Sequence, residues 1–219
     1  YFEIQSLMGH DPFSTILSLP LMTDTRLLDA MRIISRLSLA IYLSPVDVLG
    51  PLGLTQAHLS LLHGNAPSSP TAYILLALME LQFTDNIERS LSLAQAALQL
   101  TGTPGNTFHR LPTQLLAHYL ILHWGKPLRT MMDPLEQAAR EGIIQGELQF
   151  AAYTMAALFH IRLFLGHPLG EMVAEGKRLI GLMSGWGQHS VSQILALTTT
   201  WMEHNLQRGP QDPARIRGA

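Results

Sequence analysis

The sequence predicts an all-α protein, folded as a right-handed α-α superhelix of stacked helix pairs. Three observations predict this fold class. Short strings at the helix connections recur every 41 residues, glycines recur at the same spacing, and no segment shows the strict apolar and polar alternation of a half-buried strand. Several columns of residues that agree on one long period are typical of a helical repeat array.

The recurring connections are four strings of four residues. They begin at Leu43, Thr84, Gly125 and Gly166. In three of the four the third residue is proline, which suits the first turn of a helix because its missing N–H has no partner to lose there. Ser44 and Asp85 precede that position, and we expect them to be helix N-caps.

Further columns keep the 41-residue spacing. Glycine suits the left-handed turn that ends a helix, and one column consists of Gly64, Gly105, Gly146 and Gly187. A second column precedes each connection by one residue and is expected in the core: Tyr42, Phe83, Trp124 and Leu165. Two apolar columns lie inside the helices: Leu76, Ala117 and Leu158, then Met79, Leu120, Ile161 and Met202. Positions 76, 79 and 83 lie three and four residues apart, which places them on one helix face.

Helices are therefore expected over residues 24–41, 45–63, 69–83, 86–102, 107–124, 127–143, 147–165, 168–184 and 188–207. Thr23 and Asp24 offer an N-cap for the first of these. Pro51 and Pro134 fall inside expected helices, and each should kink its helix or shorten it. The opening 20 residues are expected to add one or two short helices.

A single helix pair cannot bury its own apolar stripe, so stacked neighbours must bury it jointly. The sequence therefore predicts one solenoid domain over residues 1–207. The last dozen residues carry two glycines and two prolines, and residues 208–219 are expected to form a poorly ordered tail.

The composition is poor in charge. Of the 219 residues, 47% are hydrophobic and 14% are charged, against about 25% charged in an ordinary soluble domain. A surface with so few charges favours contact with partners. The net charge of −2 gives neither the basic footprint of nucleic-acid binding nor a polybasic membrane anchor.

Cysteine is absent, which excludes disulfides and thiolate metal sites. The chain begins at Tyr1 and not at Met, so we expect it to be part of a longer protein. No stretch of about 20 continuous apolar residues is present, and the sequence is interpreted as cytoplasmic.

Four separate strings carry a resemblance to a known family. Residues 19–24 read LPLMTD with AMRI at 30–33, residues 63–68 read HGNAPS before Ala72 and Tyr73, residues 123–129 read HWGKPLR, and residues 146–153 read GELQFAAY. In this order they resemble the tetratricopeptide-like helical segment of very large bacterial signalling proteins. In such proteins a serine/threonine-kinase-like domain and an AAA-type ATPase precede the segment, and a GAF-type sensor domain and often a histidine kinase follow it.

The resemblance covers roughly residues 14–205. It implies a linker that joins the ATPase part to the sensor and output part. It does not imply kinase activity in this chain, because the family's nucleotide and phosphotransfer motifs lie outside the segment. No functional residue of the family is carried over.

The motifs that would indicate catalysis or metal binding are incomplete in this sequence. Gly125 and Lys126 suggest a phosphate loop, but that pattern needs glycine at 120 and serine or threonine at 127, where this chain has Leu120 and Pro127. The ten histidines include pairs at 58 and 63 and at 118 and 123. Side chains five residues apart on a helix point about 140° apart, so such a pair cannot chelate one ion. We therefore assign no catalytic, cofactor or metal residue.

Candidate interaction residues come from the helices expected to line the concave face. Trp201 shares a column with Leu78, Tyr119 and His160, and the chemistry of this column changes along the array, as a binding surface would. The expected interaction groove consists of Tyr73, Tyr119, His123, Tyr153, His160, Arg162 and Trp201. Ordinary packing between helices is the alternative for each of them.

The sequence is compatible with two functions. The first is a non-catalytic module that binds neighbouring domains of the same chain or a signalling partner protein, because solenoids present long surfaces. The alternative is a small-molecule sensor that uses the concave groove, lined by Tyr119, His160 and Trp201. A homodimer is an assembly that the apolar surface would permit, and neither nucleic acid nor membrane is an expected partner.

Overall fold

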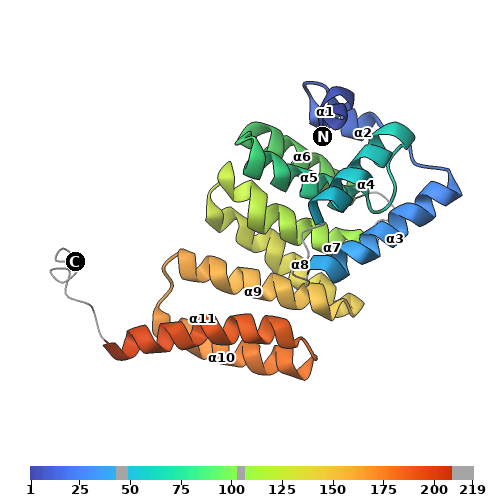
Figure 1. The fold of residues 1–219 in the computed structure, drawn as a ribbon. Coiled ribbons are helices and arrows are strands. Elements are labelled where there is room, and N and C mark those ends of the chain that lie inside the picture. The colour runs from blue at the N-terminus through green and yellow to red at the C-terminus, as the bar shows by residue number, and fades with distance from the viewer. Residues whose placement is uncertain (43–48, 103–106, 209–219) are drawn as a thin grey trace. The chain divides into compact units, whose positions relative to one another are not determined.

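The computed structural model describes residues 1–42, 49–102 and 107–208, and over these residues the chain is helical, without strands (Figure 1). The only β-type pairing there is a bridge between Leu21 and Asn65. The all-α prediction is therefore confirmed for the described part of the chain. The described helices divide between two compact units, Tyr1–Pro127 and Leu128–Ala219. The expected single solenoid over 1–207 stays a prediction.

The first unit begins with two short helices, as the sequence suggested, and continues with longer ones. Its elements are α1 (Phe2–Met8), α2 (Pro12–Ser18), α3 (Thr25–Tyr42), α4 (Leu49–His63), α5 (Ser69–Phe83), α6 (Ile87–Leu100), α7 (Thr107–Leu116), the π-helical turn η1 (Ala117–Ile121) and the 3₁₀ turn η2 (Leu122–Trp124).

Helix α5 forms the centre of the first unit. Residues 72–77 are all buried, because α4, α6 and α7 pack around this helix. Tyr73 is fully buried among them and donates a hydrogen bond from its hydroxyl to Asn65 Oδ1 at 2.8 Å. Asn65 in turn donates from Nδ2 to the Ile16 carbonyl at 2.8 Å. This buried amide ties the N-terminal segment to the central helix.

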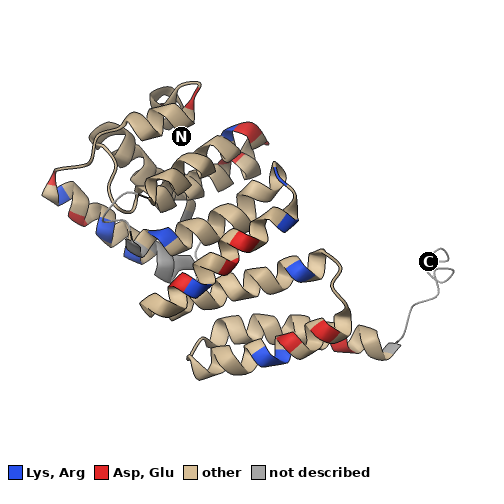
Figure 2. Ribbon diagram, turned by 180° about the vertical axis from the view of Figure 1, so that it is seen from behind, with Lys and Arg blue, Asp and Glu red and all other residues tan. Residues whose placement is uncertain are grey.

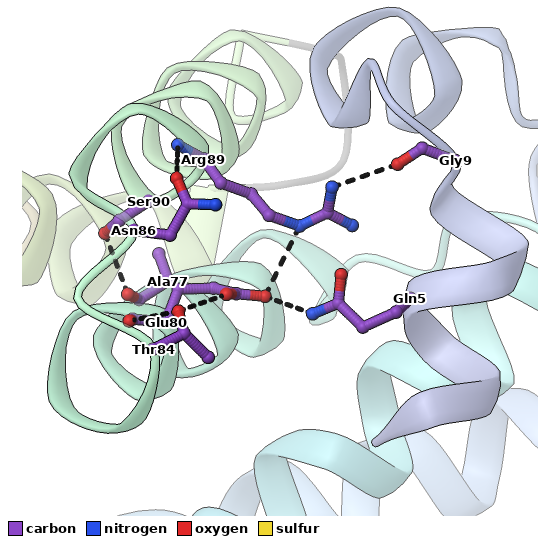
Figure 3. A network of polar contacts seen from close by, with 8 residues as sticks. All are labelled: Gln5, Gly9, Ala77, Glu80, Thr84, Asn86, Arg89 and Ser90. Carbon is purple, nitrogen blue, oxygen red and sulfur yellow. Dashed lines mark hydrogen bonds and ion pairs between the residues drawn. The ribbon is translucent and has the colours of Figure 1, made fainter.

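A second polar network fixes the N-terminal helices (Figure 3). The Glu80 carboxylate on α5 is 2% exposed and lies 3.4 Å from the Arg89 Nε on α6. Gln5 on α1 donates to the same carboxylate, and Thr84 donates to it at 2.9 Å. Arg89 Nη1 also donates to the Gly9 carbonyl at 2.9 Å. A buried charge needs such partners, so α1 is held where it completes the network.

The helix expected over 107–124 changes its winding along its length. Pro112 lies inside α7 and removes one backbone hydrogen bond. The chain widens to π-helical winding at 117–121 and then tightens to a 3₁₀ turn at 122–124. The Pro112 position was not singled out in the sequence, although an internal proline is a recognised cause of such irregularity.

The second unit consists of the 3₁₀ turn η3 (Leu128–Met131) and the helices α8 (Met132–Gln145), α9 (Leu148–Phe164), α10 (Leu169–Gly185) and α11 (His189–Arg208). Its core joins α9, α10 and α11. The members of this core are Ala152, Ala156, Phe159, Met172, Leu179, Met183, Val191, Leu195 and Met202. Gly176 lies where α10 meets the other two helices: a Cβ there would lie 2.3 Å from Thr199 Oγ1 and 3.1 Å from the Phe159 ring.

Helix ends follow the glycine column. Gly64, Gly146 and Gly187 have φ of 97°, 78° and 73°, the left-handed backbone that favours glycine. Gly105 lies outside the described residues. At Gly64 the backbone is also crowded, because a Cβ would lie 2.4 Å from the Pro20 carbonyl oxygen. Glycine is thus required there for two independent reasons.

The N-cap predictions had mixed outcomes. Asp24 caps α3 as expected, accepting from the Arg26 N–H at 2.8 Å. Asp85 does not cap α6: its φ is 52°, and the cap is Asn86, whose Oδ1 accepts from the Arg89 N–H at 3.0 Å. The connection is one residue longer than expected, because Asp85 adopts the left-handed conformation. Ser44 lies outside the described residues.

Of the two prolines expected to kink or shorten their helices, Pro134 lies in the first turn of a helix that is shorter than predicted. Pro134 is the third residue of α8, and a 3₁₀ turn over Leu128–Met131 precedes that helix. The α-helix thus begins five residues later than predicted, close to a position where proline is tolerated. Pro51 is the third described residue of α4. The predicted start of that helix at 45 lies outside the described residues, so the effect of Pro51 stays a prediction.

Candidate interaction surface

The expected groove residues of the first unit do not all face solvent. Tyr73 is fully buried and cannot contact a partner, which corrects its placement in the groove. Burial raises the pKa of its hydroxyl, which stays protonated and donates to Asn65. Tyr119, in the π-helical turn, and His123, in the 3₁₀ turn, are each half-buried. The His123 ring lies beside that of Trp124, with the centroids 5.5 Å apart.

The expected groove residues of the second unit have varied environments. Tyr153 is half-buried against the core of α9, α10 and α11. His160 Nε2 lies 3.3 Å from Thr198 Oγ1 on α11, and burial lowers the pKa of this histidine. Arg162 forms ion pairs with Glu136 at 3.1 Å and with Glu175 at 3.9 Å. These contacts hold α8, α9 and α10 together, so they describe packing within the unit.

Helix α11 carries two apolar faces. One face is buried in the unit's core through Val191, Leu195 and Met202. The other face consists of Ile194, Leu197 and Trp201, whose exposed fractions are 46%, 75% and 57%. Residues three and four apart lie side by side on a helix. We call these three residues the α11 strip.

The α11 strip is the surface that the sequence reasoning found only in part. Trp201 was selected, but Ile194 and Leu197 were not. The sequence does place Leu197 in a repeated apolar column, because it shares the 41-residue spacing with Ile74, Leu115 and Ala156. Those three residues are buried. The exposure of Leu197 follows from the absence of a neighbour on that face among the described residues.

Two members of the column expected in the core, Phe83 and Trp124, are in fact exposed. Phe83 is 76% exposed and Trp124 is 58% exposed, so their placement in the core was wrong. Each ends its helical element, so its side chain lies beyond the contact with the neighbouring helices. Leu165 is half-buried, and the Tyr42 side chain lies outside the described residues.

Charge is sparse around these apolar residues. Figure 2 shows isolated blue and red segments on otherwise tan helices. The carboxylate of Glu175 accepts two hydrogen bonds from Arg178 at 2.8 Å, and these bonds lower its pKa. Lys177 pairs with Glu203 at 2.5 Å. Glu175, Lys177 and Arg178 of α10 thus pair with nearby charges, and exposed pairs of this kind contribute little to stability.

The described residues contain no cluster of three histidine, aspartate or glutamate side chains suited to a metal ion. His58 lies 3.3 Å from Glu3, and His118 Nδ1 lies 2.8 Å from the Gln114 carbonyl. Over the same residues, every helix is too short or too polar to cross a bilayer.

Comparison with known proteins adds no relative. No protein-family model, no curated protein and no solved structure matches this chain.

Proposed function

We propose that this chain is a non-catalytic, tetratricopeptide-like helical-repeat module that couples neighbouring parts of a bacterial signalling protein. Its helix pairs repeat at about 41 residues, as the column of Gly64, Gly146 and Gly187 suggests. They stack as a right-handed superhelix, as the resemblance to tetratricopeptide-like segments implies. On the resemblance given above, the coupled parts are an ATPase on one side and a sensor or kinase on the other. The partner is protein in either case.

The α11 strip is the observation that carries this proposal. Its three side chains expose a contiguous apolar surface, and large exposed apolar groups in a row mark protein contacts. Within the second unit, Ala156 on α9 holds the position 41 residues before Leu197 and is buried in the core that α10 and α11 form with α9. The corresponding face of α11 therefore suits a further helix with an apolar stripe of its own.

The occupant that we propose is a helical segment of an adjoining domain in the same polypeptide. Burying a side chain such as leucine contributes about 1.5–3 kcal/mol. Three such side chains suffice for a tethered contact, because the linker supplies a high effective concentration. A contact between apolar helix faces needs no charge complementarity, which agrees with the low charge of the chain.

Tryptophan quenching tests this assignment in the full-length protein. A variant with W124F and W186F leaves Trp201 as the only tryptophan of this segment, and tryptophans elsewhere are replaced in the same way. We expect acrylamide to quench Trp201 several-fold less in the full-length protein than in the isolated chain. A matched variant that keeps only Trp186, which packs against the core of the second unit, should show no such difference. Equal quenching of Trp201 in both proteins would remove the proposal.

A second experiment measures the phosphotransfer output of the full-length protein. In the full-length protein, L197S with W201S should lower the phosphotransfer output that responds to the upstream domains. The unstimulated output should stay unchanged. Q193A, at an exposed polar position on the same helix, is the control and should behave as the parent. A double variant that responds normally would show that the strip does not couple the domains.

A further inference from the structure

A cleft in the first unit is independent of the α11 strip. It has a volume of about 320 Å³, which is at the small end of the range for small-molecule sites. Three segments distant in sequence line it: α3, the connection before α5, and the start of α7. Its lining residues are Leu28, Met31, Arg32, Ser35, Arg36, Ala66, Pro67, Ser68 and His109.

The floor of the cleft is apolar and fixed. Met31 and Ala66 are 1% and 3% exposed and belong to one packed cluster with Met22. Leu28 packs against that cluster from the same face of α3. Met31 and Ala66 thus form a fixed base, and the apolar surface open to a ligand is that of Leu28, which is half-buried, and Pro67, which is exposed.

The rim of the cleft on α3 is basic. Arg32 and Arg36 lie four residues apart, so their like charges repel on the helix surface. Arg32 is offset by an exposed pair with Asp29 at 3.3 Å, a contact too weak to hold it against a stronger partner. Arg36 has no ion-pair partner among the described residues. In Figure 2, α3 accordingly shows more blue than red. Among the described residues, the charge of Arg36 is thus not offset by an ion pair, and Arg36 lines the cleft.

Ser68 adds a nearly buried polar side chain to the lining of the cleft. It is 3% exposed and occupies the N-cap position of α5, yet its side chain makes no capping hydrogen bond. Its Oγ accepts from Gln56 Nε2 at 3.4 Å, and no acceptor for its own O–H is recorded among the described residues. The first turn of α5 adds the positive end of a helix dipole. His109 is uncharged at neutral pH, because burial lowers its pKa to about 4.

We infer that this cleft binds a small organic anion, a carboxylate or phosphate joined to an apolar body. The Arg36 and Arg32 guanidinium groups would take the anionic group, since their planar donors match carboxylate and phosphate oxygens. The Ser68 hydroxyl would donate a further hydrogen bond, and the apolar body would lie on Leu28 and Pro67, close to the buried Met31. Such binding relieves the repulsion between the two arginines.

Methyl NMR of the 219-residue chain with ¹³C-methyl methionine tests the inference. The Met31 methyl lies on the cleft floor, and the buried Met183 methyl of the second unit serves as the internal reference. The probes are phenyl phosphate, benzoate and the neutral benzyl alcohol. We expect phenyl phosphate or benzoate to shift Met31 in a saturable manner with a Kd on the order of 1 mM, while Met183 stays in place.

Two charge-matched variants decide whether the arginines are responsible. R36Q should weaken binding of the anionic probe about tenfold, as expected for the loss of a hydrogen bond to a charged group. R26Q, on the exposed first turn of the same helix and outside the cleft, removes the same charge and should bind as the parent. An equal Met31 shift with benzyl alcohol, an unchanged affinity in R36Q, or no shift up to about 50 mM of either anion overturns the inference.

Discussion

Removing the cation from the buried Glu80 network should destabilise the first unit. Glu80 is 2% exposed and forms an ion pair with Arg89, whose side chain is 14% exposed. In R89M the carboxylate would keep its hydrogen bonds from Gln5 and Thr84 but lose its counter-charge. Breaking a buried pair costs about 3–5 kcal/mol. Because the two hydrogen bonds remain, we expect the lower value, about 3 kcal/mol at pH 7.

The double variant separates the charge from the packing. E80L alone leaves a partly buried guanidinium and should cost about 2 kcal/mol, whereas E80L with R89M removes both charges and should also cost only about 2 kcal/mol. The two residues should therefore show a coupling energy of about 3 kcal/mol.

Native-state hydrogen exchange is the suitable assay, because it reports the two units separately. The slowest amides of α5 should exchange about a hundredfold faster in R89M than in the parent, and those of α10 should not change. Additive effects of the two substitutions, within about 0.5 kcal/mol, would refute the reasoning.

Three further predictions use the same measurements. In α10, G176A should destabilise the second unit by about 1–3 kcal/mol, because its Cβ would overlap Thr199 Oγ1. The control G181A, whose Cβ would meet no neighbouring atom, should stabilise the unit by about 0.5–1 kcal/mol. Equal effects of the two substitutions would contradict the close packing at Gly176. G64A should cost more than about 2 kcal/mol, because strained φ adds to a backbone clash, and a loss below about 1 kcal/mol would exclude that clash. Burial lowers the pKa of His109 from 6.5 to about 4, so the unfolded chain takes up a proton at a higher pH than the folded chain does. The free energy of unfolding should therefore be constant above pH 6.5 and should fall by about 2–3 kcal/mol between pH 6.5 and pH 4. Compared with the parent, H109Q should show a flatter profile of unfolding free energy over that window, and identical profiles would show that this histidine does not contribute.

The functional surfaces were predicted less well than the helices. Trp201 was selected from its variable column, and it is exposed as a binding residue must be. Tyr73 was selected because its helix was expected to line the concave face. It is buried, because α5 is apolar around its circumference and helices cover it on several sides. A column of residues shows that a position repeats, but it does not show how many neighbours that position has. The cleft beside α3 was not foreseen, since its lining comes from three segments with no shared motif.

The sequence by itself determined the all-α class and the approximate extent of most described helices. It did so because helix boundaries depend on local chemistry: Gly64, Gly146 and Gly187 favour left-handed turns, and Asp24 caps the helix that follows it. Only the tertiary structure decided which apolar side chains are buried. Phe83 ends α5 and Leu197 lies on α11, and both are exposed because burial requires a neighbouring helix. That requirement depends on contacts between distant segments, which local periodicity does not specify.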